Sequence, residues 1–264
     1  MKSILVFMAF LSLSANAQVN SGPRFTALAS AGVALQDPWS IQQNQAGLAA
    51  LKSAAVAIAM EKPFAGFDLS TQSVILIIPV RNNVIGMSMQ RFGLSSFTEQ
   101  RTAVTYAKSF GNELFIAINL NHHLLRIENY GSSQTYSVEA GTQYRLNDDF
   151  LIGVHIANPV RSFPRSEVSL NVPSRIQVGA AYKFSEKVLF CSSLERINGD
   201  RSDGRFGLEY QVLELFALRG GISANPFKQY AGFGINYQKL RFDFATAAHP
   251  VLGYSPQVAL SYEF

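Results

Sequence analysis

The sequence predicts an all-β protein: a transmembrane antiparallel β-barrel of about fourteen strands with an N-terminal, hatch-like segment in its lumen. Three observations support this fold class. Apolar residues alternate with small or polar residues up to the last residue, a secretion signal precedes this pattern, and short connections alternate with long ones. A soluble β-sandwich shows the first feature but has no reason to show all three.

Residues 1–17 have the composition of a secretory signal peptide. Lys2 supplies the positive charge, residues 4–13 the apolar core and residues 15–17 the small-residue cleavage site. We expect the mature chain to begin at Gln18 and to reach the outer membrane of a Gram-negative cell. No later apolar run approaches the roughly 20 residues of a membrane-spanning helix, which excludes an inner-membrane helical protein.

The composition fits a membrane barrel. Charged residues make up 15% of the chain, below the about 25% that is usual in soluble domains. The 20 Phe and 10 Tyr suit aromatic girdles. The net charge of +4 is not clustered, so we expect outer-membrane lipid as a partner and no nucleic acid. Cys191 is the only cysteine, and we expect it to be a small side chain on a strand.

Residues 18–52 lack the alternation and are rich in Ala and Gly. Asp37 suits the N-cap of a short helical turn that begins with proline. We expect this segment to fold into the lumen from the periplasmic end as a hatch; the alternative is a surface arm that packs below the barrel. Trp39, Asn44 and Gly47 are the candidate hatch residues. Trp39 is expected to be an anchor or ordinary core, and Asn44 a hydrogen-bonding partner of the wall or a helix cap.

The alternation predicts the strands of a barrel domain over residues 53–264. We expect them at 53–61, 67–80, 84–92, 98–110, 114–127, 134–146, 150–157, 175–184, 188–197, 205–212, 216–224, 229–237, 240–248 and 254–264. An even number of strands is what a single-chain bacterial barrel requires.

The connections predict the orientation of the barrel. Tight turns are expected at 111–113, 147–149, 185–187, 213–215 and 238–239. Longer connections lie between them, at 93–97, 128–133, 158–174, 198–204 and 250–253. Such barrels have short periplasmic turns and longer extracellular loops, so we expect both chain termini on the periplasmic side.

The register of the strands predicts a polar lumen. If Val212 lies opposite Phe216, then Glu209 faces Arg219 across the ladder, where opposite charges attract. A charge on the lipid face would cost about 2–4 kcal/mol for Arg or Lys at the midplane, so the charges belong inside. The expected lumen network comprises Arg175, Gln177, Glu209, Arg219, Asn236, Arg241 and Asp243. Further inward polar residues are Glu139, Gln143, Arg145 and Lys183.

Several segments resemble a known family. They are LNVPSRIQVGAAYKFSEKVLF, RFGLEY, LFALRGGIS and the C-terminal run that begins with YAGFGINYQKLRFDF. These resemble the PorV/PorQ group of outer-membrane proteins, distant relatives of the FadL long-chain fatty-acid channels. ASAGVALQDPWSIQQNQAGLA resembles their N-terminal motif, with Gln45 where that motif usually carries Pro. The resemblance implies a fourteen-stranded barrel with an N-terminal segment in its lumen.

Two functions follow as expectations. The first is an accessory of protein secretion or surface attachment of the PorV/PorQ kind, acting through secretion-system proteins. The alternative is a FadL-like passive channel for hydrophobic small molecules, with the N-terminal segment as its gate. A channel needs a continuous apolar pocket or a lateral opening between strands, whereas an accessory barrel can be filled by side chains.

An enzyme is the rival class, and we expect none. Of the four histidines, His122 and His123 point to opposite faces of a strand and cannot chelate one metal together. His155 points inward and His249 lies beside a loop. No G-x-S-x-G, H-E-x-x-H or metal-spaced cluster occurs, so we expect neither a catalytic site nor a metal or cofactor.

Overall fold

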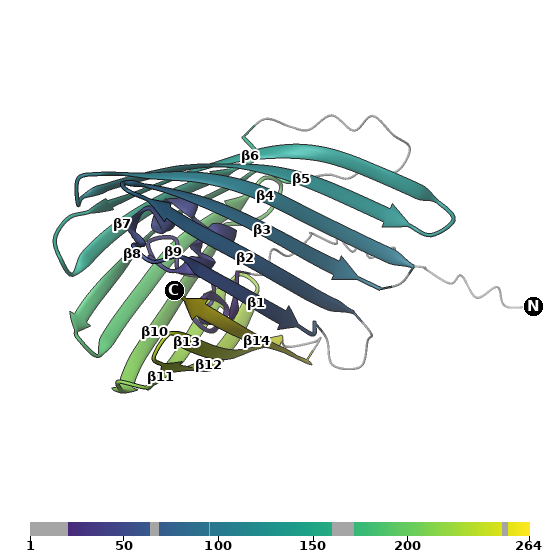
Figure 1. Cartoon of the computed structure of the whole chain (residues 1–264). Helices are drawn as coiled ribbons and strands as arrows, with labels where there is room; N and C mark the ends of the chain where they lie inside the picture. The colour runs from purple at the N-terminus through teal and green to yellow at the C-terminus, as the bar shows by residue number, and fades with distance from the viewer. Residues whose placement is uncertain (1–20, 64–68, 95, 160–171, 250–252) are drawn as a thin grey trace, which may run out of the picture.

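The computed structural model describes residues 21–63, 69–94, 96–159, 172–249 and 253–264. Fourteen antiparallel strands form a closed barrel in which each strand pairs with its neighbours in sequence and β14 closes on β1 (Figure 1). The predicted antiparallel β-barrel of about fourteen strands is confirmed. The predicted signal peptide, the start of the mature chain and the first residues of the predicted strand 67–80 lie outside the described residues.

The strand bounds differ from the predicted ones by a few residues. They are β1 Ala55–Glu61, β2 Ser70–Val80, β3 Asn83–Gly93, β4 Phe97–Phe110, β5 Leu114–Ile127, β6 Gly131–Arg145, β7 Phe150–Ala157, β8 Arg175–Ser185, β9 Val188–Ile197, β10 Asp203–Leu213, β11 Phe216–Ala224, β12 Phe227–Tyr237, β13 Leu240–His249 and β14 Gly253–Glu263.

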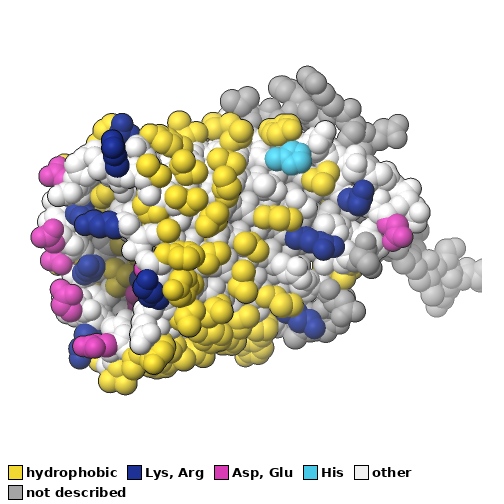
Figure 2. Space-filling view, viewed as in Figure 1, with side chains coloured by type: hydrophobic (Ala, Val, Ile, Leu, Met, Phe, Trp, Pro, Cys, Tyr) yellow, Lys and Arg dark blue, Asp and Glu magenta, His cyan; other side chains and the backbone are white. Residues whose placement is uncertain are grey.

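Every strand turns large hydrophobic side chains outward. One such residue from each strand in turn is Ile58, Val74, Ile85, Val104, Ile118, Val138, Ile152, Val178, Leu194, Leu208, Leu218, Ile235, Phe242 and Leu260. On the face shown in Figure 2, hydrophobic side chains form a band with charged residues at both ends. A chain of ring contacts runs through Phe150, Tyr182, Phe184 and Phe190. This outer surface suits a lipid environment.

The two ends of the barrel differ. The turns that follow β2, β4, β6, β8, β10 and β12 are short and lie at one end, together with the C-terminus (Figure 1). Two predicted turns were wrong by one residue, because β-bulges in β8 and β10 make Ser185 face Val188 and Leu213 face Phe216. One connection at the opposite end, between Ala224 and Phe227, is as short as a turn.

Residues 21–51 pack inside the ring of strands, and we call them the inner segment. They form α1 (Pro23–Ala27) and two 3-10 helices, η1 (Pro38–Gln42) and η2 (Gln45–Ala50). Almost every residue of the segment is buried. Among the residues that the structure describes, no helix is long and apolar enough to cross a membrane.

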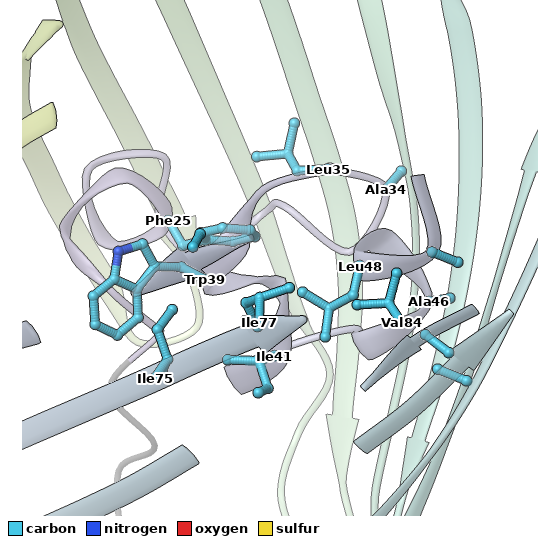
Figure 3. Packing of buried hydrophobic residues seen from close by; sticks show 14 of the residues in the cluster. Phe25, Ala34, Leu35, Trp39, Ile41, Ala46, Leu48, Ile75, Ile77 and Val84 are labelled. Carbon is cyan, nitrogen blue, oxygen red and sulfur yellow. The ribbon is translucent and has the colours of Figure 1, made fainter. Parts of the chain in front are cut away.

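The inner segment forms a hydrophobic core with one side of the wall. Trp39 is 1% exposed, and Ile75 of β2 points towards it (Figure 3). Ile41 and Leu48 face Ile77 of the same strand in the same cluster. Inward apolar residues of β1 to β3 form much of this core, and further strands add Ala107, Phe115, Ala117, Ala181, Cys191 and Ala259.

Candidate functional site

A closed ring of six charged side chains joins the inner segment to the wall near the short-turn end. Three arginines alternate with three carboxylates, in the order Asp37, Arg24, Glu209, Arg219, Asp243 and Arg241. We call this set the charge ring. Two members come from the inner segment and four from β10, β11 and β13.

Arg24 connects the two parts of the charge ring. Its Nε and Nη2 donate to the two carboxylate oxygens of Glu209 at 2.9 and 2.7 Å. Its Nη1 donates to Oδ2 of Asp37 at 2.9 Å. A bidentate pair of this kind adds directional specificity to the charge attraction. The contact therefore holds α1 in one position against β10.

The wall residues complete the charge ring. Arg219 donates to Glu209 at 2.5 Å and to Asp243 at 2.6 Å. Arg241 Nη1 donates to Asp37 Oδ2 at 3.0 Å, and its Nε lies 2.8 Å from Asp243 Oδ2. Asp37 and Asp243 are 2% and 0% exposed. Buried charges need paired partners, so the ring is satisfied only while the inner segment is docked.

The predicted lumen residues divide between the charge ring and other positions. Glu209 faces Arg219 in the ladder, and Asn236 faces Arg241, as the register predicts. Asn236 adds no side-chain contact to the ring in the described part of the chain. Arg24 is absent from the sequence prediction. It and Asp37 are the only charged residues in 21–51, and this isolated pair of opposite charges is the signal that could have found them.

A second polar cluster fastens the other side of the inner segment. Gln45 of η2 donates to Glu139 of β6 at 2.6 Å, and His155 of β7 lies 3.2 Å from the same oxygen. The other oxygen of Glu139 accepts from Arg101 at 2.7 Å and from Asn121 at 3.2 Å. Gln45, which stands where the N-terminal motif of the resembled family usually carries Pro, thus donates a hydrogen bond to the wall.

Two further inward residues bind the backbone of the inner segment. Gln143 donates to the carbonyl oxygens of Val33 and Leu35 at 3.1 and 3.0 Å. Gln177 donates to the carbonyl of Ser30 at 3.1 Å. These side chains fix the course of the segment between its helices.

The candidate hatch residues all lie at close contacts. Asn44 takes both expected roles: it caps η2 through Ala46 N and donates to the wall carbonyl of Thr142 at 3.3 Å. Trp39 lies in the core, and Asp37 caps η1 as expected. A Cβ on Gly47 would lie 2.3 Å from the carbonyl oxygen of Leu35, so only glycine fits there.

A cavity of about 290 Å³ lies in the lumen on the side of the long connections. The inner segment contributes Thr26, Ser30 and Gln43 to its lining. The rest of the barrel contributes apolar and aromatic groups such as Phe92, Ile197 and Tyr230 together with eight charged residues: Glu61, Glu99, Arg101, Glu139, Arg175, Glu195, Arg205 and Lys228. A second cavity shares part of this lining and extends to Asp200 and Arg201 near the rim. The lining of this cavity therefore mixes charged and apolar groups.

Two adjacent histidines of β5 point to opposite faces of the wall. His122 points outward against Tyr136, whereas His123 points inward and lies 2.8 Å from the hydroxyl of Ser137. A nucleophile–base pair needs a third group that orients the base. Within the described residues the second ring nitrogen of His123 has no such partner. The side chain of His249 lies outside the described residues, and the described part contains no cluster of three or more metal-ligating side chains.

Comparisons with solved structures match this barrel over nearly its whole length. The toluene transporter TbuX of Ralstonia pickettii has a TM-score of 0.72 at 11% identity and covers 92% of this chain and 98% of its own. The P. putida toluene transporter TodX has a TM-score of 0.71 at 9% identity and covers 90% and 98%. A Pseudomonas aeruginosa FadL homologue has a TM-score of 0.66 at 10% identity and covers 92% and 98%.

The chain has the barrel fold of FadL-like channels. At these identities the likeness shows the fold alone. Two of the three matched proteins are named as toluene transporters, and the third is named as a FadL homologue. No family model and no curated protein matches the chain. The resemblance to the PorV/PorQ group has no counterpart among these structures, whereas the FadL-like part of it agrees with them.

The charge ring makes docking of the inner segment sensitive to acid. Burial opposes ionisation of Asp37, but the guanidinium groups of Arg241 and Arg24 outweigh it and hold the pKa of this carboxyl below its ordinary value. Stabilisation by Asp37 is therefore complete above the ordinary pKa of about 4 and is lost as the pH falls through the lowered value. We expect the emission of Trp39 to shift to the red only below about pH 4. Asp37→Asn should show the shifted emission already at neutral pH, and an acid transition of wild-type size in that variant would contradict the assignment.

Proposed function

We propose that this protein is a passive outer-membrane channel for small molecules and that residues 18–52 are its hatch. The observation that carries the proposal is the position of the inner segment, which lies inside the ring of strands and lines the cavity. The outward hydrophobic band supports a place in the outer membrane. The alternation of short and long connections supports a periplasmic short-turn end.

The contacts of the inner segment suit a displaceable hatch. Polar side chains hold it on two sides, and no disulfide ties it to the wall, because Cys191 is the only cysteine. Docked, the segment pairs its own Arg24 and Asp37 with Glu209 and Arg241 of the wall. Displaced, it would leave the lumen continuous from the cavity to the periplasm. The equilibrium between these two states would set the permeability of the barrel.

Removal of the hatch tests the proposal. We expect planar bilayers with the full mature chain to show low conductance with rare openings, and a variant that lacks residues 21–51 to show a permanently open pore. Far-ultraviolet circular dichroism and heat-modified gel mobility verify that the variant still forms a barrel. Equal conductance of the two folded proteins would overturn the hatch, and an impermeable deletion variant would overturn the channel.

The expected class of cargo, hydrophobic small molecules, is supported by the names of the matched toluene transporters. The cavity lining mixes charged and apolar residues, so it does not by itself select such cargo. The proposed cargo is therefore small molecules in general, and the class of solute depends on the chemistry of the cavity.

A secretion accessory of the PorV/PorQ kind stays a prediction from the resemblance of the chain segments. No feature of the described lumen or wall favours it over the channel. Affinity purification from mild detergent would decide between them, because an accessory should retain secretion components and a channel should not.

A further inference from the structure

Arg101, which lines the cavity, has a hydrogen-bond donor without a partner in the described residues. The side chain is 7% exposed and lies on β4. Its Nε donates to Asn121 at 2.8 Å and its Nη2 to Glu139 at 2.7 Å. Its Nη1 is buried and has no partner in the described residues. A buried donor of this kind costs about 1–3 kcal/mol unless an acceptor binds it.

Arg175 of β8 lines the same cavity with most of its donors unused. Its Nη1 lies 3.8 Å from Glu195 Oε2, beyond hydrogen-bonding distance. Glu195 is already engaged by Arg205 at 2.6 Å. Arg101 and Arg175 repel each other electrostatically. An anion between two guanidinium groups would relieve this repulsion and satisfy their free N–H groups.

The cavity carries as many carboxylates as cations, but these carboxylates are not equally available. Glu139 and Glu195 already accept hydrogen bonds from arginines. Glu99 lies two residues from Arg101 along β4, towards the rim, and would keep an anion deep in the cavity. Glu195 Oε2 and the side-chain oxygen of Gln43 also lack a hydrogen-bond partner in the described residues, so an anion at the inner end would have to contact the arginines away from these two oxygens.

We propose that this cavity binds a small organic carboxylate whose head group lies between Arg101 and Arg175. Apolar groups of Phe92, Ile197 and Tyr230 in the lining would contact the body of the molecule. A cavity of about 150 Å³ holds benzene, so the observed 290 Å³ accommodates an aromatic monocarboxylate with room for water. Transport of such a solute rests on the proposed channel function, whereas its binding does not.

Isothermal titration of the full mature chain in detergent at low salt tests the proposal with four probes. Benzoate carries the head group, benzyl alcohol and toluene carry the ring without the charge, and inorganic phosphate carries charge without the ring. We expect benzoate to bind at least about tenfold more tightly than the other three, since a charged hydrogen bond contributes about 1.5–3 kcal/mol. Toluene or benzyl alcohol binding as tightly as benzoate would overturn the proposal, as would the absence of benzoate binding. If phosphate bound as tightly as benzoate, the site would be a general anion site, and its proposed preference for an organic carboxylate would be overturned.

Arg175→Gln should weaken benzoate binding at least about tenfold. Arg175→Lys should keep part of the benzoate affinity, because lysine restores the positive charge but lacks the planar guanidinium that can donate two parallel hydrogen bonds to a carboxylate. Arg91→Gln is the matched control, since Arg91 is exposed on the neighbouring β3 outside the cavity, and it should leave binding unchanged. Unchanged Trp39 emission verifies that each variant is folded. If neither Arg175 variant lost benzoate binding, the assignment of the site to Arg175 would be overturned even if the channel conducts. If the barrel bound benzoate but was impermeable, only the proposed channel function would be overturned.

Discussion

Asp37→Asn is expected to release the inner segment from the barrel wall. The substitution leaves the three arginines of the charge ring with two carboxylates and therefore buries an uncompensated positive charge. Removal of one partner from a buried ion pair costs about 3–5 kcal/mol. That cost shifts the docking equilibrium at least about a hundredfold. The emission of Trp39, the only tryptophan and buried when docked, should move to the red, and conductance should rise.

A double variant separates loss of docking from damage to the barrel. Arg24→Gln with Asp37→Asn removes both inner members of the charge ring and leaves four balanced wall charges that still pair. We expect the inner segment to be loose, as in the single variant, but the thermal stability of the barrel to be closer to wild type. Arg205→Gln is the control, because Arg205 pairs only with wall residues. If Asp37→Asn kept the emission and conductance of the wild type, the charge ring would not hold the segment.

Gly221→Ala is expected to push α1 away from the wall, whereas Gly220→Ala is not. A Cβ on Gly221 would lie 2.7 Å from the backbone nitrogen of Ala29 and 2.8 Å from the carbonyl carbon of Leu28. A Cβ on the adjacent Gly220 would lie 3.8 Å from its nearest neighbour, the carbonyl oxygen of Tyr230. Overpacking of this kind costs about 1–3 kcal/mol, and here the backbone of the inner segment has to give way.

The glycine pair is a matched experiment because both residues lie on β11 and receive the same added methyl group. Red-shifted Trp39 emission and higher conductance are expected for Gly221→Ala alone. Gly220→Ala, on the outer face, should keep both at wild-type values and lose no thermal stability, since it also restricts the unfolded chain. A similar response of the two variants would show that the effect comes from the strand and not from the contact with the inner segment.

The alternation of side chains was enough to predict which residues line the lumen. Glu209, Arg219, Arg241 and Asp243 were placed inside by parity, and the structure finds them there. Parity works because successive side chains of a strand point to opposite faces, and lipid excludes charge from one of them. The two misplaced turns show its limit, because a β-bulge adds one residue without a marked change in the pattern.

The partners of those lumen residues depend on tertiary structure. Arg24 meets Glu209 across 185 residues of chain, and Gln45 meets Glu139 across 94. Alternation tells which face a side chain occupies, but it carries no information on what approaches that face. The inner segment has no such period, so its path could only follow from packing against the finished barrel. The local pattern therefore determined the barrel and its polar interior, whereas the docking of residues 21–51 and the shape of the cavity arose from long-range contacts.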